Sequence, residues 1–184
     1  MDETRIQAAP IETERLRLRK LCTTDAGDIF DYASDPEVTR YVFFNTHAMP
    51  EQTIAYIASF GRPSKTAWAM VHRAEDRVIG IVFLHSIKDD CATAELAYNV
   101  ARDLWGKGFA TEAARAILSH CFTCTDLQTI EGACMIDHAA SARVLEKAGL
   151  QFREIREKSR SKNGVAYDLR HYAIGRQEWL ASNG

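Results

Sequence analysis

Residues 103–114, D-L-W-G-K-G-F-A-T-E-A-A, combine a glycine turn with the start of a helix, and this combination can bind phosphate. The turn, Gly106-Lys107-Gly108, follows an apolar run at residues 92–100, and apolar residues recur at helical spacing after it. The first N–H groups of a helix have no acceptor within the helix, the helix dipole makes that end positive, and glycine lets a ligand approach the backbone. The same spacing also serves a plain start of a helix, so the turn alone leaves phosphate binding open.

Two nucleotide-binding motifs are excluded by single positions in this turn. A Walker motif requires Ser or Thr after Gly-Lys, and here Gly108 follows Lys107. The dinucleotide-binding fingerprint requires a third glycine three residues after the second, and Thr111 occupies that position. Neither motif therefore explains the turn.

Glu95 is a lone carboxylate in the apolar run before the turn. If this run is a strand, alternation places Glu95, Ala97 and Asn99 on one face and Leu96 and Tyr98 on the other. A buried carboxylate must be hydrogen-bonded or must face a cleft, because an unpaired buried charge is costly. Glu95 is therefore either a reactive group in a cleft or a structural or substrate-pocket hydrogen-bond partner.

These residues require a scaffold in which strands and helices are interleaved. Periodicity and turn residues predict seven strands, at residues 14–21, 67–72, 78–84, 91–100, 130–136, 152–157 and 165–174. They also predict five helices: one begins after residue 24, one begins at residue 50, and the others lie at residues 37–41, 111–122 and 140–148. Trp179 and Leu180 are expected to pack a frayed tail. The order predicts one α/β domain over residues 1–184, its core at about 10–176, with a mixed sheet covered on both faces.

Composition narrows the class of protein. The 184 residues are 46% hydrophobic, which suits a single domain with a substantial core, and the formal net charge of −2 implies neither nucleic acid nor a membrane surface as a partner. Five cysteines without zinc spacing predict no metal site and free thiols. No apolar signal region and no run near the roughly 18 residues of a membrane span is present, so a cytoplasmic protein is expected.

Three segments together resemble one family. They are A-E-L-A-Y-N-V at 94–100, L-W-G-K-G-F-A-T-E-A at 104–113 and A-S-A-R-V-L-E-K-A-G-L at 140–150, and they resemble the GNAT superfamily of acyl-CoA-dependent N-acetyltransferases. Residues 12–21 and 34–41 also resemble the subgroup that contains the ribosomal-protein alanine and serine N-acetyltransferases. The resemblance implies a GNAT-like fold, with a mixed, mostly antiparallel sheet of about seven strands, and acetyl-CoA as cosubstrate.

The resemblance also implies a cofactor site. In the family, amides of the glycine loop hold the coenzyme A pyrophosphate, and the pantetheine arm pairs with the end of the preceding strand. Carried over to this sequence, the strand residues are Tyr98, Asn99 and Val100, and the loop residues are Trp105, Gly106, Lys107, Gly108, Phe109, Ala110 and Thr111. His138 stands where the family usually has an Asn that contacts pantetheine, and Ser141 lies near the position of the thiol.

Direct attack of an amine on a thioester requires a base for the amine and a proton for the leaving thiolate. Glu95 is the candidate base, acting directly or through a water, with a structural hydrogen bond as the alternative. Many family members use a tyrosine as the acid, but that position here is Leu145, which leaves Ser141 as either the proton donor or a helix-capping serine. No cysteine stands in a nucleophile context, which disfavours an acetyl-enzyme.

Several classes of primary amine fit the sequence as the acceptor. The resemblance favours a protein N-terminus of the ribosomal-protein type, with a small amine such as a polyamine, amino acid or aminoglycoside as the alternative. A non-catalytic acyl-CoA sensor is the alternative outside enzymes, and either a monomer or a homodimer fits. The segments expected to contact the acceptor are Phe43, Phe44, Asn45, His47 and residues 159–167, in a basic hairpin whose charges are expected to be solvated.

Overall fold

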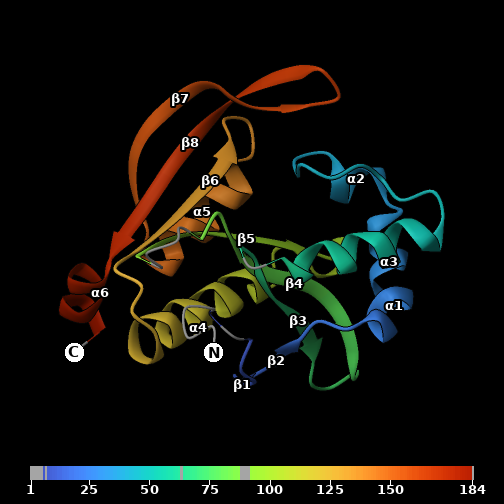
Figure 1. Ribbon diagram of the computed structural model, residues 1–184, viewed down its shortest axis with the longest axis horizontal. Helices are drawn as coiled ribbons and strands as arrows, with labels where there is room; N and C mark the ends of the chain where they lie inside the picture. Colours follow the sequence, from blue (N-terminus) through green and yellow to red (C-terminus); the bar gives the residue numbers. More distant parts are fainter. Residues whose placement is uncertain (1–5, 7, 63, 88–91, 184) are drawn as a thin grey trace.

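The computed structural model describes residues 6, 8–62, 64–87 and 92–183, and it contains one eight-stranded sheet (Figure 1). The strand order is β1-β2-β3-β4-β5-β6-β8-β7. The strands are β1 (Ile11–Glu12), β2 (Leu16–Lys20), β3 (Thr66–His72), β4 (Arg77–His85), β5 (Thr93–Val100), β6 (Thr129–Met135), β7 (Gln151–Lys162) and β8 (Val165–Gly175). The predicted start of the fifth of these at Cys91 lies outside the described residues.

The expected mixed sheet of about seven strands is confirmed, and β1 adds an eighth strand. This strand has two residues, Ile11 and Glu12, and it pairs antiparallel with Leu18 and Arg17 of β2. A tight turn in which the Thr13 N–H donates to the Leu16 carbonyl (2.9 Å) joins the two strands. Two residues are too few to show an alternating pattern, so periodicity could not reveal β1.

All neighbouring strands are antiparallel except β5 and β6, which are parallel. Their pairing begins at Thr93 with Thr129 and ends at Leu96 with Gly132, although β5 continues to Val100. Parallel neighbours need a crossover connection, and α4 (Phe109–Cys124) supplies it. The two strands therefore separate at the end of β5 that leads to the glycine turn.

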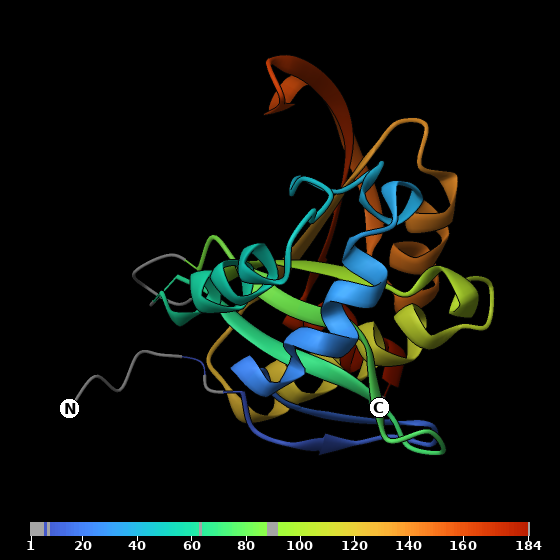
Figure 2. The same ribbon diagram turned by 90° about the vertical axis from the view of Figure 1, so that its right-hand side faces the viewer.

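Helices cover both faces of the sheet (Figures 1 and 2). The apolar residues of α1 (Ala26–Ala33) and α3 (Pro50–Ala58) pack on one face, and those of α4 and α5 (Ala139–Ala148) pack on the other. The remaining helical segments are α2 (Pro36–Thr39), α6 (Arg176–Asn183) and the short 3-10 turns η1 (Thr23–Asp25), η2 (Ser59–Gly61) and η3 (Arg102–Leu104). No helix in the described part of the chain is long and apolar enough to span a membrane.

The C-terminal tail is ordered as α6 rather than frayed. Trp179 packs on Phe122 of α4 with ring centroids 5.7 Å apart. The Arg176 guanidinium donates to the carbonyls of Phe122 (2.6 Å) and Leu127 (2.7 Å). The Phe122 carbonyl lies in the last turn of α4, where carbonyls have no partner within the helix, and Leu127 lies between α4 and β6. The two bonds join α6 to the rest of the fold.

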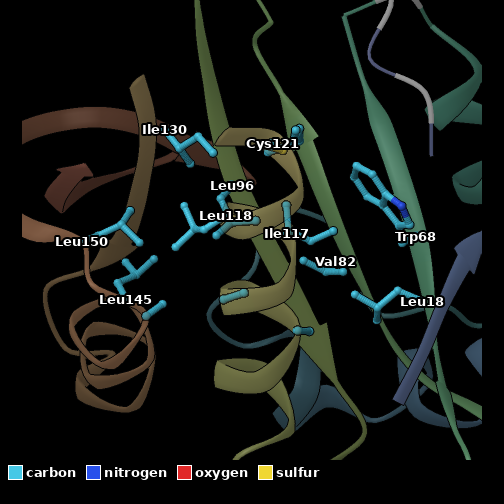
Figure 3. Packing of buried hydrophobic residues seen from close by; sticks show 14 of the residues in the cluster. Leu18, Trp68, Val82, Leu96, Ile117, Leu118, Cys121, Ile130, Leu145 and Leu150 are labelled. Atoms are coloured by element: carbon cyan, nitrogen blue, oxygen red, sulfur yellow. The ribbon is translucent and has the colours of Figure 1, made fainter. Parts of the chain in front are cut away.

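The core between α4 and the sheet fixes where the glycine turn lies. Ile117, Leu118 and Cys121 lie on one side of α4 and are fully buried against Leu96 of β5 and Val82 of β4 (Figure 3). The i, i+1, i+4 spacing of the three α4 residues produces this stripe. Because α4 begins directly after the turn, this packing holds the first turn of the helix beside the end of β5.

The β7–β8 hairpin is longer than predicted and reaches the other half of the molecule. It projects past the other strands and bends toward the segment around α2 (Figures 1 and 2). The Lys162 ammonium donates to the Thr39 carbonyl at 2.6 Å. Phe43, after α2, contacts Tyr167 edge-on with ring centroids 6.4 Å apart. The expectation of a purely solvated hairpin is therefore corrected at Lys162.

Candidate active site

A cleft of about 890 Å³ opens where β5 and β6 separate. Residues 97–100 of β5 line one side, and Ala133 and Cys134 of β6 line the other. The first turns of α4 and α5 close one end, and aromatic residues near α3 close the opposite end. The cleft thus joins the glycine turn, the Glu95 strand and the start of α5, which are the three predicted parts of the site.

The backbone at the end of β5 faces the gap at alternate residues. Ala101 N–H donates to the Ile79 carbonyl (2.8 Å), and Val100 is opposite Gly80. In an antiparallel ladder this makes Asn99 and Ile81 the hydrogen-bonded pair, so the backbone groups of Tyr98 and Val100 point toward β6. Of the three residues predicted to pair with pantetheine, Tyr98 and Val100 direct their backbone groups toward β6, and Asn99 directs its own toward β4.

Trp105 occupies part of this edge. Its indole Nε1–H donates to the Val100 carbonyl at 2.8 Å, although the side chain is 48% exposed. The bond ties the glycine turn to the end of β5. An extended ligand with amide groups can therefore pair best with the backbone of Tyr98.

The glycine turn has the backbone geometry of an anion site. Gly106 and Gly108 have φ values of 75° and 86°, in the left-handed region that favours glycine. Gly108 is the N-cap of α4, and the Glu112 N–H donates to its carbonyl at 3.0 Å. Because this is the first bond of the helical ladder, the N–H groups of residues 109–111 have no acceptor within the helix. They lie at the cleft, at the positive end of the helix dipole.

Arg15, directly before β2, braces this turn and was not anticipated from the sequence. Its Nη1 donates to the Lys107 carbonyl (2.9 Å), and its Nε donates to Glu112 Oε2 (2.7 Å). Thr13 Oγ1 also donates to Glu112 at 2.7 Å. Burial raises the pKa of Glu112, but the hydrogen bonds from Thr13 and Arg15 outweigh it and hold the pKa below its ordinary value. Only the folded chain brings Arg15 to a turn 92 residues away.

Glu95 is both hydrogen-bonded and in the cleft. It is 8% exposed, and its Oε2 accepts an ion-paired hydrogen bond from the Arg160 guanidinium of β7. His85 lies opposite it on β4, with Nε2 at 3.6 Å from Oε1. Burial, together with the nearby cations of Arg160 and Lys65, lowers the pKa of His85 to about 4. His85 is therefore neutral at pH 7, and its contact with Glu95 is not an ion pair.

Ser141 contacts a phenol rather than capping its helix. His138 is the N-cap of α5, and Ser141 is the third helical residue. The Tyr98 phenol lies 3.0 Å from Ser141 Oγ and 3.1 Å from the Ser141 carbonyl. Burial raises the pKa of Tyr98 well above its ordinary value, so the phenol keeps its proton. Sequence reasoning used only the backbone of Tyr98, although strand alternation already placed its side chain on the face that α5 covers.

His138 lines the cleft at the start of α5. Its ring stacks on Tyr41, with centroids 4.5 Å apart and planes 13° apart. Burial lowers the pKa of His138, so the ring is neutral at pH 7. The stacking fixes the ring between α5 and the segment after α2.

The far end of the cleft is an aromatic wall, defined by Phe43, Phe44, Tyr56, Phe60 and Phe83. Tyr56 contacts Phe44 at 4.7 Å and Phe60 at 5.0 Å between ring centroids. Of the predicted acceptor-contacting residues, Phe43, Phe44 and Arg160 therefore line the cleft.

Two other predicted acceptor residues do not line the cleft. His47 is buried, and its Nδ1 is 2.8 Å from Thr53 Oγ1, which gives it a structural partner. Asn45 is also absent from the residues that line the cleft. Among the described residues, no group of three His, Cys, Asp or Glu side chains has the geometry to hold a metal ion.

Comparison with known proteins identifies the family. The family model of the acetyltransferase (GNAT) domain matches residues 15–151. The uncharacterized N-acetyltransferase YoaA of Bacillus subtilis (strain 168) is 31% identical over 168 residues, which cover 89% of this chain and 95% of YoaA.

Solved structures share the fold. A GNAT-family acetyltransferase from Bacillus anthracis has a TM-score of 0.83 at 25% identity, covering 92% of this chain and 99% of that chain. RimL, a ribosomal L7/L12 alpha-N-protein acetyltransferase in complex with coenzyme A, has a TM-score of 0.81 at 15% identity, covering 91% and 98%. At that identity the likeness to RimL shows the fold alone. The chain belongs to the GNAT family, and it is an acetyl-CoA-dependent N-acetyltransferase.

Proposed function

We propose that this enzyme transfers the acetyl group directly from acetyl-CoA to a primary amine that lies at Glu95. One observation carries the proposal: a single cleft contains a buried carboxylate, the Tyr98–Ser141 hydroxyl pair and a helix N-terminus preceded by two left-handed glycines. A base, a proton donor and an anion site are the groups that direct transfer requires.

The donor would lie along the gap between β5 and β6. Its pyrophosphate would bind the amides of residues 105–111, where the helix dipole favours negative charge. Its pantetheine arm would pair with the backbone of Tyr98, and His138 would donate a hydrogen bond to that arm. The first turn of α5 would then hold Ser141 beside the thioester sulfur.

The proposed chemistry requires proton transfer at two groups: the acceptor ammonium must lose a proton, and the leaving thiolate must gain one. Glu95 accepts a proton from the ammonium, directly or through one water, and the free amine attacks the thioester carbonyl. The new C–N bond forms as the C–S bond breaks, and the thiolate takes a proton from the Ser141 hydroxyl. The second proton that the attacking nitrogen loses as the amide forms returns through solvent to Ser141 and restores its hydroxyl. Tyr98 stabilises Ser141 by its hydrogen bond and keeps its own proton, because burial raises the pKa of the phenol.

The acceptor class that we favour is the N-terminal amine of a protein, because RimL, which shares the fold, is described as acting on such an amine. A small amine is the second candidate, supported by the aromatic wall, which encloses the far end of the cleft. The two classes share the requirement for a free primary amine at Glu95.

The test compares Glu95→Gln with the wild-type enzyme in a screen of N-terminal peptides and small amines, measuring thiol release from acetyl-CoA. We expect kcat/KM to fall roughly 100-fold or more, since general bases contribute that much, while acetyl-CoA affinity is retained. Glu131→Gln is the matched control, because Glu131 pairs with Glu95 in the sheet register but does not line the cleft. Undiminished acetylation by Glu95→Gln would refute the assigned base.

A further inference from the structure

Four side chains surround the position proposed for the acceptor amine, and we call Lys65, His85, Glu95 and Arg160 the acceptor cluster. The cluster contains one carboxylate and two cations, since His85 is neutral with a pKa near 4. The carboxylate is already paired, because Glu95 Oε2 accepts from the Arg160 guanidinium.

The other acidic residues that line the cleft do not neutralise the excess cation of the acceptor cluster. Glu37 of α2 pairs at 3.8 Å with Arg40, which follows that helix, and Asp137 precedes α5. Neither forms an ion pair with Lys65 or Arg160 among the described residues. The acceptor end of the cleft therefore carries a surplus of positive charge.

A simple ammonium ion is a poor match for this arrangement. When it approaches Glu95 it brings a second cation to a carboxylate that Arg160 already neutralises, and the like charges repel in a partly buried site. Arg160 is also held in place, since its guanidinium carbon lies 5.6 Å from the centre of the Phe43 ring. An acceptor that brings one negative charge with its amine removes the repulsion.

We propose that the acceptor is a primary amine that carries a carboxylate close to the amine, and that Arg160 binds this carboxylate. The inference rests on the proposed function and names the acceptor class of the same site. Glu95 Oε1, which lies 3.6 Å from His85, faces the amine, while Oε2 remains with Arg160. A guanidinium has five N–H donors in a planar fork, so it can bind Glu95 on one edge and a second carboxylate on another.

The geometry of Arg160 permits this double contact. Its side chain is 31% exposed, whereas that of Glu95 is 11% exposed, and both residues line the cleft, so more of Arg160 than of Glu95 is accessible to a ligand. The aromatic wall lies on the same side and suits an apolar body. Two sources share this chemistry: a free amino acid with an apolar side chain, and a peptide N-terminus with an acidic residue beside it.

The experiment measures kcat/KM for acceptors that differ only in the carboxylate. The amino-acid arm compares L-phenylalanine with L-phenylalaninamide, and the peptide arm compares C-terminally amidated peptides that begin Ala-Asp or Ala-Asn. In at least one arm we expect the carboxylate to be preferred by about tenfold or more in the wild-type enzyme, which is typical of hydrogen bonds to charged groups. The arm that responds identifies the source.

Variants of Arg160 connect this preference to the proposed residue. The ratio between matched acceptors should fall to about one in Arg160→Gln and should be partly retained in Arg160→Lys. Arg156→Gln is the control and should keep the wild-type ratio, because Arg156 pairs with Glu154 on the exposed face of β7 and does not line the cleft. A ratio within one enzyme is unaffected by losses of folded protein.

The outcomes separate this proposal from the one on which it rests. Wild-type enzyme that acetylates the neutral acceptors as well as the carboxylates overturns the acceptor class and leaves the function standing. A preference that persists unchanged in Arg160→Gln overturns the role of Arg160. If the wild-type enzyme binds acetyl-CoA but acetylates no amine of any kind, the proposed function fails, and this inference fails with it.

Discussion

The phenol oxygen of Tyr98, on β5, lies 3.0 Å from the hydroxyl oxygen of Ser141, on α5. This contact joins the strand proposed to pair with pantetheine to the helix proposed to supply a proton. Many family members have a tyrosine that acts as the general acid at the position of Leu145. Here Leu145 is instead buried against Gly132 of β6. The phenol thus reaches the start of α5 from the sheet rather than from the helix.

Removal of either hydroxyl should slow the step in which the thiolate leaves. We expect Ser141→Ala to lower kcat by about 10- to 100-fold and Tyr98→Phe by less, because Tyr98 acts through Ser141. Acetyl-CoA affinity, measured by calorimetry, should change little, since the pyrophosphate and backbone contacts remain. Tyr172→Phe is the control, because its phenol donates to Glu146 outside the cleft. A normal kcat in Ser141→Ala would show that solvent supplies the proton.

A side chain at the first glycine of the turn should weaken cofactor binding. Gly106 has a φ of 75° and open space around its Cβ position, so an alanine there meets no neighbour but strains the backbone by about 1–2 kcal/mol. Relief of that strain would turn the neighbouring amides away from the pyrophosphate. Calorimetry should show Gly106→Ala binding acetyl-CoA at least about tenfold more weakly.

Gly27→Ala is the matched control for this substitution. Gly27 lies in α1, has open space at its Cβ position and has no left-handed φ. The change should leave acetyl-CoA affinity unaltered and raise stability by about 0.4–1 kcal/mol. Equal affinity in the two variants would contradict the assignment of the turn as the pyrophosphate site.

Local patterns predicted most of the scaffold, including the glycine turn and the strand that carries Glu95. Alternation in β5 put Glu95 and Tyr98 on opposite faces, and the glycine turn marked the start of α4, as the structure shows. Both features depend on residues within a few positions of one another, which is the range over which periodicity carries information. The residues that contact the acceptor were predicted less accurately than the scaffold.

The missed contacts all depend on long-range geometry. Arg160 meets Glu95 across 65 residues, and Lys162 meets Thr39 across 123 residues. Both contacts depend on the path of the β7–β8 hairpin, in which the pairing of the two strands shifts register between Arg156 and Arg160. The backbone direction of Asn99 required the register of β4 and β5, since a shift of one residue reverses every residue of a strand.

The Arg15–Glu112 contact should make stability depend on pH in the acidic range. The folded-state pKa of Glu112 is below its ordinary value of 4.5, so its stabilising effect is complete above that value and is lost as the pH falls through the folded-state pKa. At neutral pH, Glu112→Gln should lower the free energy of unfolding by about 1–3 kcal/mol, because bonds from Thr13 and Arg15 are weakened.

Urea unfolding of the wild-type enzyme and Glu112→Gln over a series of pH values tests this. The difference between the two should be constant near neutral pH and should shrink below about pH 4.5. Arg17→Gln is the control, because the exposed Arg17–Asp76 pair should contribute at most about 1 kcal/mol. A difference that grows on acidification would contradict the sign of the shift.

The pKa of His85 should respond to the charge of Arg160. Burial is the largest cause of its fall to about 4, and the cations of Arg160 and Lys65 add to it. Arg160→Gln removes one cation, so the pKa should rise but remain below the ordinary value of 6.5, since burial persists. Titration of the histidine Cε1–H resonances by NMR measures this, and His120, whose pKa burial alone lowers, should not move. An unchanged His85 midpoint would mean that Arg160 is not beside Glu95 and His85 in solution, and the acceptor cluster would lose its central contact.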